Sequence, residues 1–219
     1  MPVSSVQSSW LTQDYRWNEA ASRYIAENGR FVPRAIVDVA LEQTIAGSQN
    51  EMVLLSERLQ NGSLSVAEWR SAMGQQVKLL HTAEAALARG GWAQMTPSDW
   101  GWVGSQVKKQ YQFLDKFAGQ IASGKQPLNG RFFQRVRMYA AAGRGTFEEM
   151  RRRYMRIHKG AAEERRLLGI AEHCDDCVEY ADRSWQPVGT LPAIGQSQCL
   201  THCKCHFEFR DANGNAIGG

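Results

Sequence analysis

All five cysteines of this 219-residue chain lie within its last 46 residues. They form a Cys-x2-Cys pair, a gap of 21 residues and a Cys-x3-Cys-x-Cys group. Two closely spaced sets of thiols joined by a loop are the ligand arrangement of structural tetrahedral Zn²⁺ sites. The spacing therefore predicts a structural zinc site whose ligands come from Cys174, Cys177, Cys199, Cys203 and Cys205.

The sequence identifies the ligands in the first set of cysteines more directly than those in the second set. Cys174 and Cys177 form the obvious first pair, because x2 spacing lets one tight turn aim both thiolates at a single metal. For the second pair we expect Cys199 and Cys203, and Cys205 is the strongest competitor.

The histidines near these cysteines are weaker ligand candidates than the cysteines themselves. His202 is a substitute for a cysteine of the second pair, whereas His173 and His206 flank ligands without an obvious place of their own. The sequence contains no His-Glu-x-x-His motif, and nothing in the pattern marks an open coordination position. We therefore expect a structural metal and no enzymatic activity.

Disulfides and redox chemistry are the alternatives for these cysteines. Disulfides suit small secreted domains, but the first ten residues lack the basic and apolar regions of a signal peptide, and an odd cysteine count leaves one thiol over. A thioredoxin-like Cys-x-x-Cys lies between a strand and a helix. Here a charged stretch that we interpret as helical, Glu163–Leu168, precedes the motif. Zinc remains the favoured interpretation.

The rest of the chain has the patterning of a mainly α-helical protein. It is 43% hydrophobic and 22% charged, and no apolar run approaches the roughly 18 residues of a membrane span, so no membrane partner is expected. Apolar residues recur at helical spacing over most of residues 1–160. We predict a helical scaffold and assembly domain over 1–160 and a Cys-rich zinc-binding unit with a short C-terminal β-hairpin over 161–219.

Capping signals place several of these helices. Ser65 and Glu68 have the spacing of a capping box. Thr96 is a second expected cap, followed by a proline at the first helical position and by Asp99 in the first turn. We also expect a short helix over Asn18–Ala26, a helix from Pro33 that Gly47–Ser48 interrupts, a helix after Asn129, and a further helix capped by Thr146. At the C-terminus, His206–Arg210 alternates like a strand and precedes turn residues.

Positive charge is concentrated just before the cysteines. Residues 131–166 hold eleven Arg or Lys and four Glu, a net charge of +7, although the whole chain carries only +4. Such a stripe is suited to nucleic-acid phosphates or to an acidic protein surface, and a solvated helix face is the plainer alternative. The candidate contact residues are Arg135, Arg137, Arg151, Arg152, Arg153 and Arg156.

The C-terminal third resembles the head morphogenesis (minor head) proteins of tailed bacteriophages, the group that includes the F protein of phage Mu. The resemblance rests on Cys174-x2-Cys177, a loop with Gly and Pro, and the closing Cys203-Lys204-Cys205. Many family members carry a histidine where this chain has Cys199. The match covers about 40 residues.

This resemblance implies a structural protein of the virion head, assembled in the bacterial host cytoplasm. Its expected partners are the portal protein, the major capsid protein and packaged DNA, within a multimeric particle. Zn²⁺ would hold the C-terminal tip rigid for docking. The alternative function is a zinc-containing nucleic-acid-binding protein that uses the arginines of residues 131–166.

Overall fold

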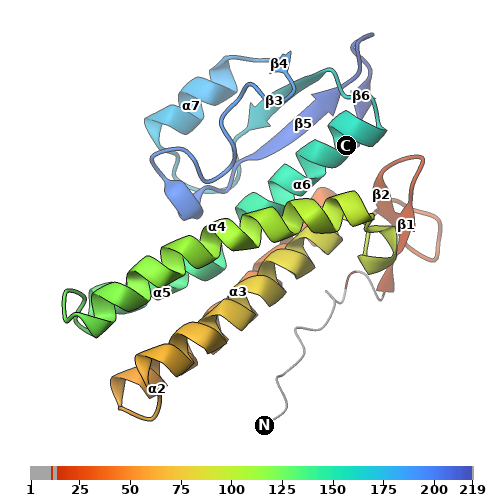
Figure 1. The fold of residues 1–219 in the computed structure, drawn as a ribbon. Coiled ribbons are helices and arrows are strands. Elements are labelled where there is room, and N and C mark those ends of the chain that lie inside the picture. Colours follow the sequence, from red (N-terminus) through yellow and green to blue (C-terminus); the bar gives the residue numbers. More distant parts are fainter. Residues whose placement is uncertain (1–10, 12–13, 219) are drawn as a thin grey trace.

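The computed structural model describes Leu11 and residues 14–218, and helices dominate it (Figure 1). The prediction of a mainly helical fold is confirmed. A short 3-10 turn, η1 (Trp92–Gln94), links the second and third of the long helices. In chain order the helices of this region are α2 (Arg34–Gln60), α3 (Val66–Arg89), α4 (Pro97–Ala122), α5 (Gly130–Ala141) and α6 (Gly143–His158).

The local sequence accounts for three of these helix starts. Ser65 accepts a hydrogen bond from the backbone N–H of Glu68, and the Glu68 carboxylate accepts from the backbone of Ser65, as a capping box requires. The same reciprocal bonds join Thr96 and Asp99 at the start of α4. The Asn129 side chain caps α5 by accepting from two backbone N–H groups.

The predicted helix over Asn18–Ala26 is wrong, because a two-stranded hairpin occupies this segment. Its strands are β1 (Arg16–Asn18) and β2 (Arg23–Ile25), which pair antiparallel. The Asn18 side chain accepts from the N–H of Ala21, which favours a turn over a helix. Tyr24 is buried and its hydroxyl donates to the Leu87 carbonyl at 2.8 Å, so contact with α3 holds the hairpin.

Two other expectations for the helical region also fail. Gly47–Ser48 does not interrupt α2, because Ser48 is buried among the packed helices and this packing outweighs the weak local helix propensity. Thr146 does not cap a helix, since α6 begins three residues earlier. Its hydroxyl lies inside the protein, 2.5 Å from Nδ1 of His81.

The C-terminal unit contains a small antiparallel sheet with strand order β4-β3-β5-β6. β5 and β6 form the predicted C-terminal hairpin. The short helix α7 (Asp175–Asp182) and the 3-10 turn η2 (Leu200–His202) lie between strands in the sequence. The strands are β3 (Glu163–Leu167), β4 (Gln186–Pro187), β5 (His206–Arg210) and β6 (Ala216–Ile217).

The charged stretch before the cysteines is therefore a strand and not a helix. Glu164 and Arg166 are buried and point to one face of β3, where they pair in register with Phe209 and Phe207 of β5. A strand alternates its faces with a period of two, so two charged residues can be buried while their neighbours stay half-exposed. Their buried partners, described below, outweigh the local resemblance to a charged helix.

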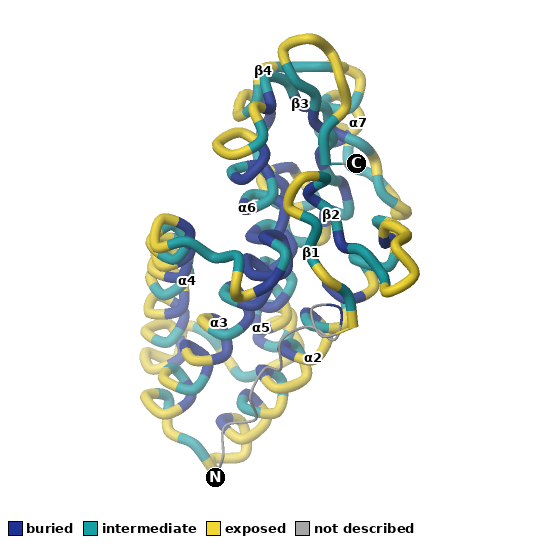
Figure 2. The backbone as a smooth tube through the Cα atoms, turned by 90° about the vertical axis from the view of Figure 1, so that its right-hand side faces the viewer, coloured by how far each residue is buried: buried dark blue, intermediate teal, exposed yellow. Residues whose placement is uncertain are grey.

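The buried apolar residues form two clusters. Figure 2 marks buried residues in dark blue, both along the helices and in the C-terminal unit. The larger cluster lies among α2–α6 and includes Trp69, Phe117 and Phe132. The second lies in the C-terminal unit, but it includes Tyr154 and Met155 from the last turns of α6. α6 therefore belongs to both cores and joins the two regions proposed at residue 160.

Candidate metal centre

The five cysteines lie on three short segments of the C-terminal unit. Cys174 is the residue before α7, and Cys177 lies in its first turn. Cys199 and Cys203 precede and follow the single turn η2. Cys205 comes directly before β5. Helix start, turn and strand start thus converge, so residues separated by the 21-residue gap are brought together as the sequence predicted.

The distances between sulfurs suit a tetrahedral metal. Cys177 Sγ lies 3.5 Å from Cys199 Sγ and 3.7 Å from Cys203 Sγ. In a regular tetrahedron with Zn–S bonds of about 2.3 Å, neighbouring sulfurs lie about 3.8 Å apart. All five cysteines are free, and a disulfide would require a separation of about 2.05 Å. The arrangement could therefore hold a metal ion through thiolate ligands.

Cys177 is the centre of the cluster. It belongs to one group with Cys174 and Cys199 and to a second with Cys203 and Cys205, and the sulfurs within each group lie within 4.8 Å of one another. Either group supplies three ligand atoms to a metal ion. The closeness of the Cys203 and Cys205 thiols shifts their pKa values in opposite directions: it lowers the pKa of Cys203 to about 5 and raises the pKa of Cys205.

The nearby histidines are less central than the cysteines. His173 Nδ1 lies 4.0 Å from Cys205 Sγ, at the edge of the cluster. His202 is exposed in η2, and His206 is a half-buried residue of β5. Among the described residues, the groups with ligand spacing are formed by cysteines, so none of these histidines joins a candidate ligand set.

Arg166 is a functional residue that sequence reasoning missed. It is 1% exposed, and its guanidinium donates to Cys177 Sγ at 3.7 Å, to Ser197 Oγ at 2.9 Å and to the Pro192 carbonyl. Four thiolates around Zn²⁺ would carry a net charge of −2, and a buried cation beside one sulfur offsets part of that charge. The sequence of β3 does not alternate between polar and apolar residues, so no local signal marked Arg166 as buried.

A second buried arginine ties the loop before η2 to α6. Arg152 donates to both carboxylate oxygens of Glu164 and to the Leu191 carbonyl. Glu164 in turn accepts from the backbone N–H groups of Gly189 and Leu191. A helix, a strand and a loop are thus joined by one buried carboxylate, which positions the segment that leads to Cys199.

The structure corrects part of the predicted arginine stripe. Arg152 is only 7% exposed and is bound as described above. Arg151 donates to the backbone carbonyls of Phe207 and Gly218 at 2.6 and 2.5 Å. Both arginines face the C-terminal sheet and are used within the fold, because a helix packed against a sheet directs part of its circumference inward.

The other four candidates lie nearer the surface but are not one continuous row. Arg135 donates to the side chains of Gln120 and Gln126, and Arg153 donates to Ser98 Oγ at 2.7 Å. Arg137 and Arg156 are exposed on α5 and α6. The fold therefore distributes these charges over two helices.

No protein-family model, curated protein or solved structure matches this chain. Within Leu11 and residues 14–218, no helix is both long enough and apolar enough to span a lipid bilayer. The function proposed next therefore depends on the geometry of the cysteine cluster and on the resemblance of its motif.

Proposed function

We propose that this chain is a structural assembly protein whose C-terminal unit is stabilised by one Zn²⁺. The observation that carries the proposal is the convergence of the five cysteines, with sulfur separations close to those of a ZnS₄ tetrahedron. The C-terminal unit is small, and a metal supplies folding free energy that a short sheet and one helix lack.

The ligands we propose are Cys174, Cys177, Cys199 and Cys203. Cys177 contacts both Cys199 and Cys203, and Cys174 shares a group with Cys177 and Cys199. Cys203 belongs to the second group, so metal binding would draw its sulfur towards those of Cys174 and Cys199 and leave Cys205 outside the tetrahedron. This assignment agrees with the ligand pair expected from the spacing.

Metal content measured by mass spectrometry on the native protein tests this assignment. We expect about one zinc per chain, lost in Cys177→Ser and retained in Cys205→Ser. Because both cysteines are buried in the same cluster, the two variants form a matched pair. Equal loss of zinc from the two variants would show that Cys205 is a ligand in place of Cys174 or Cys199. A native protein that contains no metal would refute the site.

We propose further that the chain is a minor head protein of a tailed bacteriophage. The support is the resemblance of Cys174-x2-Cys177 and Cys203-Lys204-Cys205 to the head morphogenesis motif, together with the meeting of these two segments in space. In this role α2–α6 form the body and the metal-bound tip docks on portal or major capsid protein.

Co-expression with the portal and major capsid proteins of the same genome tests the assembly role. We expect the chain to sediment with assembled heads and to leave them when Cys177→Ser is introduced. A chain that stays at the top of the gradient while complete heads form would contradict the proposal. Binding to DNA that falls log-linearly with salt would instead favour the nucleic-acid alternative.

A further inference from the structure

Four hollows adjoin one another along α4 and form a long groove, called the α4 groove below. Their volumes are about 500, 430, 370 and 220 Å³. Each shares lining residues with the next: Met138 joins the first two, Phe113 the second and third, and Trp102 the third and fourth. The α4 residues that line the groove run from Trp102 to Phe113, about 17 Å at 1.5 Å per helical residue.

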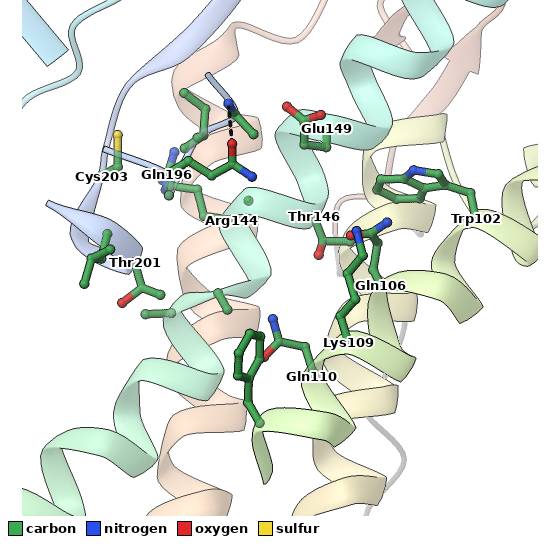
Figure 3. Close-up of a pocket in the computed structure, with 18 residues that line it drawn as sticks. Trp102, Gln106, Lys109, Gln110, Arg144, Thr146, Glu149, Gln196, Thr201 and Cys203 are labelled. Carbon is green, nitrogen blue, oxygen red and sulfur yellow. Dashed lines mark hydrogen bonds between the residues drawn. The ribbon is translucent and has the colours of Figure 1, made fainter. Parts of the chain in front are cut away.

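The metal-binding segment forms one wall of this groove. Figure 3 shows Gln106, Lys109 and Gln110 projecting from α4 on one side, with Gln196 and Thr201 on the other. Thr201 lies between two of the proposed ligands, and Cys203 itself lines the hollow. Metal binding therefore shapes the groove directly.

The middle of the groove carries exposed apolar side chains. Phe113 is 58% exposed and Leu200 is 50% exposed, and Met138 lies beside them. Leu200 has a backbone φ of +46°, a left-handed conformation that costs a non-glycine residue about 1–2 kcal/mol. Apolar anchors exposed together on a concave surface mark a place where a partner packs.

Basic side chains line the groove at both ends and also in the middle, where Lys109 and Arg144 line the third hollow. Lys125, Arg131 and Arg135 line the hollow at one end, and Arg153 and Arg156 line the hollow at the other. The lining of the four hollows includes a single carboxylate, Glu149, which already pairs with Arg152. An occupant complementary to this pattern has apolar groups that face Phe113 and Leu200, with negative charge on either side of them.

We propose that the α4 groove binds an acidic amphipathic segment of a partner protein. The exposed aliphatic side chains favour a protein segment over single-stranded nucleic acid, which binds on aromatic side chains that stack against successive bases. Leu200 and Met138 offer no such stacking surface. The inference deepens the proposed assembly role, on which it rests, by naming the surface that docks and the chemistry of its partner.

Fluorescence anisotropy with the zinc-loaded chain tests the proposal. The probe is a labelled peptide of about 20 residues, a helical length of about 30 Å, with leucines at its centre and glutamates at both ends. We expect saturable binding in the micromolar range, about −7 to −8 kcal/mol. A peptide with lysines in place of the glutamates is expected to bind at least about tenfold more weakly, because the basic ends repel it.

Two variants separate the groove from the fold. Leu200→Asn removes the apolar anchor while keeping a residue that tolerates positive φ, and Phe113→Ser removes an exposed ring. Each is expected to weaken peptide binding at least about tenfold and to keep its zinc. Leu54→Ser, on the exposed face of α2 at 53% exposure, is the matched control and should bind like the unmodified chain.

The outcomes distinguish the groove from the proposed function. Equal binding by Leu200→Asn, Phe113→Ser and the unmodified chain would overturn the docking surface and leave the zinc site standing. Preference for a thymidine oligonucleotide over the acidic peptide would assign the groove to nucleic acid instead. Removal of zinc is expected to abolish peptide binding because the wall at Leu200 and Thr201 is held between ligands, and unchanged binding without zinc would overturn that coupling.

Discussion

At the scale of single residues, Gly169 shows how closely the metal site is packed. A Cβ added at this position would lie 2.1 Å from the carbonyl oxygen of Lys204, inside any allowed contact. Lys204 lies between Cys203 and Cys205, so the backbone that enters the cluster presses directly on the glycine. Only a residue without a side chain permits this approach.

Gly169→Ala is therefore expected to displace the Cys203–Cys205 segment. Zinc affinity should fall by about 10- to 100-fold, the usual effect of disturbing the surroundings of metal ligands. A chelator competition titration measures the change. Gly160→Ala is the control near the same strand, since a Cβ there meets nothing within 4 Å, although its φ of +68° adds a small backbone strain. Equal affinities in the two variants would contradict the prediction.

His81 is a buried group in the helical core whose charge is linked to stability. It is 1% exposed, and burial lowers its pKa from 6.5 to about 4. A base with a lowered folded pKa contributes stability above its unfolded pKa and loses it as the pH falls towards the folded value. The folded protein should therefore weaken between pH 6.5 and pH 4, by about 2 kcal/mol at pH 5.

Urea denaturation at pH 7 and pH 5 measures this effect. His81→Gln keeps a polar group that can bond to Thr146 but does not titrate, so the fall in unfolding free energy should be smaller by about 2 kcal/mol in the variant. Acid also protonates the proposed zinc ligands, but it does so equally in the variant and in the unmodified chain. Subtracting the two changes in unfolding free energy therefore removes that shared effect. A variant that loses as much stability as the unmodified chain would show that His81 is not the group responsible.

At the scale of elements, the contact between α6 and β3 depends on a buried ion pair. Glu164 is fully buried, and Arg152 donates to both of its carboxylate oxygens. Removing one partner of such a pair leaves an uncompensated buried charge. The strand and the loop that leads to Cys199 would lose their common anchor on α6.

Glu164→Gln is expected to destabilise the C-terminal unit by about 3–5 kcal/mol. Glu208→Gln on the neighbouring strand is the matched control, because Glu208 pairs with Arg165 at the surface, where both side chains are about 40% exposed. Its cost should stay within about 1 kcal/mol. Thermal unfolding of the zinc-loaded variants compares them, and similar losses of stability would disprove the special role of the buried pair.

At the scale of the whole molecule, two cores share α6 but differ in what stabilises them. The larger core consists mainly of apolar side chains from α2–α6 and contains none of the five cysteines. The second includes three of those cysteines, so we expect its folding to be linked to the proposed metal binding. Loss of the metal should therefore act on one core and spare the other.

Chelation with EDTA is expected to unfold residues beyond Gly160 while most of the helical circular dichroism remains. Limited proteolysis should then cleave in this region and leave a fragment that contains α2–α6. Cys177→Ser without chelator should give the same fragment. Loss of the whole helical signal in one step would instead show that the two cores fold as a single cooperative unit.

The starts of three helices and the clustering of the five cysteines are the features that the sequence by itself determined, because both depend on local spacing. Capping boxes at Ser65 and Thr96 join groups three residues apart, and Cys-x2-Cys places two thiols within one helical turn. The residues that form such a signal are close together in the sequence and stay in contact in the fold. The cysteine cluster, its five members and the C-terminal hairpin were therefore predictable.

Only the tertiary structure decided the identity of β3, the burial of Arg152 and Arg166, and the α4 groove. β3 is a charged segment whose local pattern is helical, and it becomes a strand because β5, some 40 residues later, pairs with it. A buried arginine has the same sequence signal as an exposed one until its carboxylate or sulfur partner is known. These features depend on contacts between segments that are distant in the sequence. The stabilisation that such contacts provide cannot be inferred from the local sequence pattern.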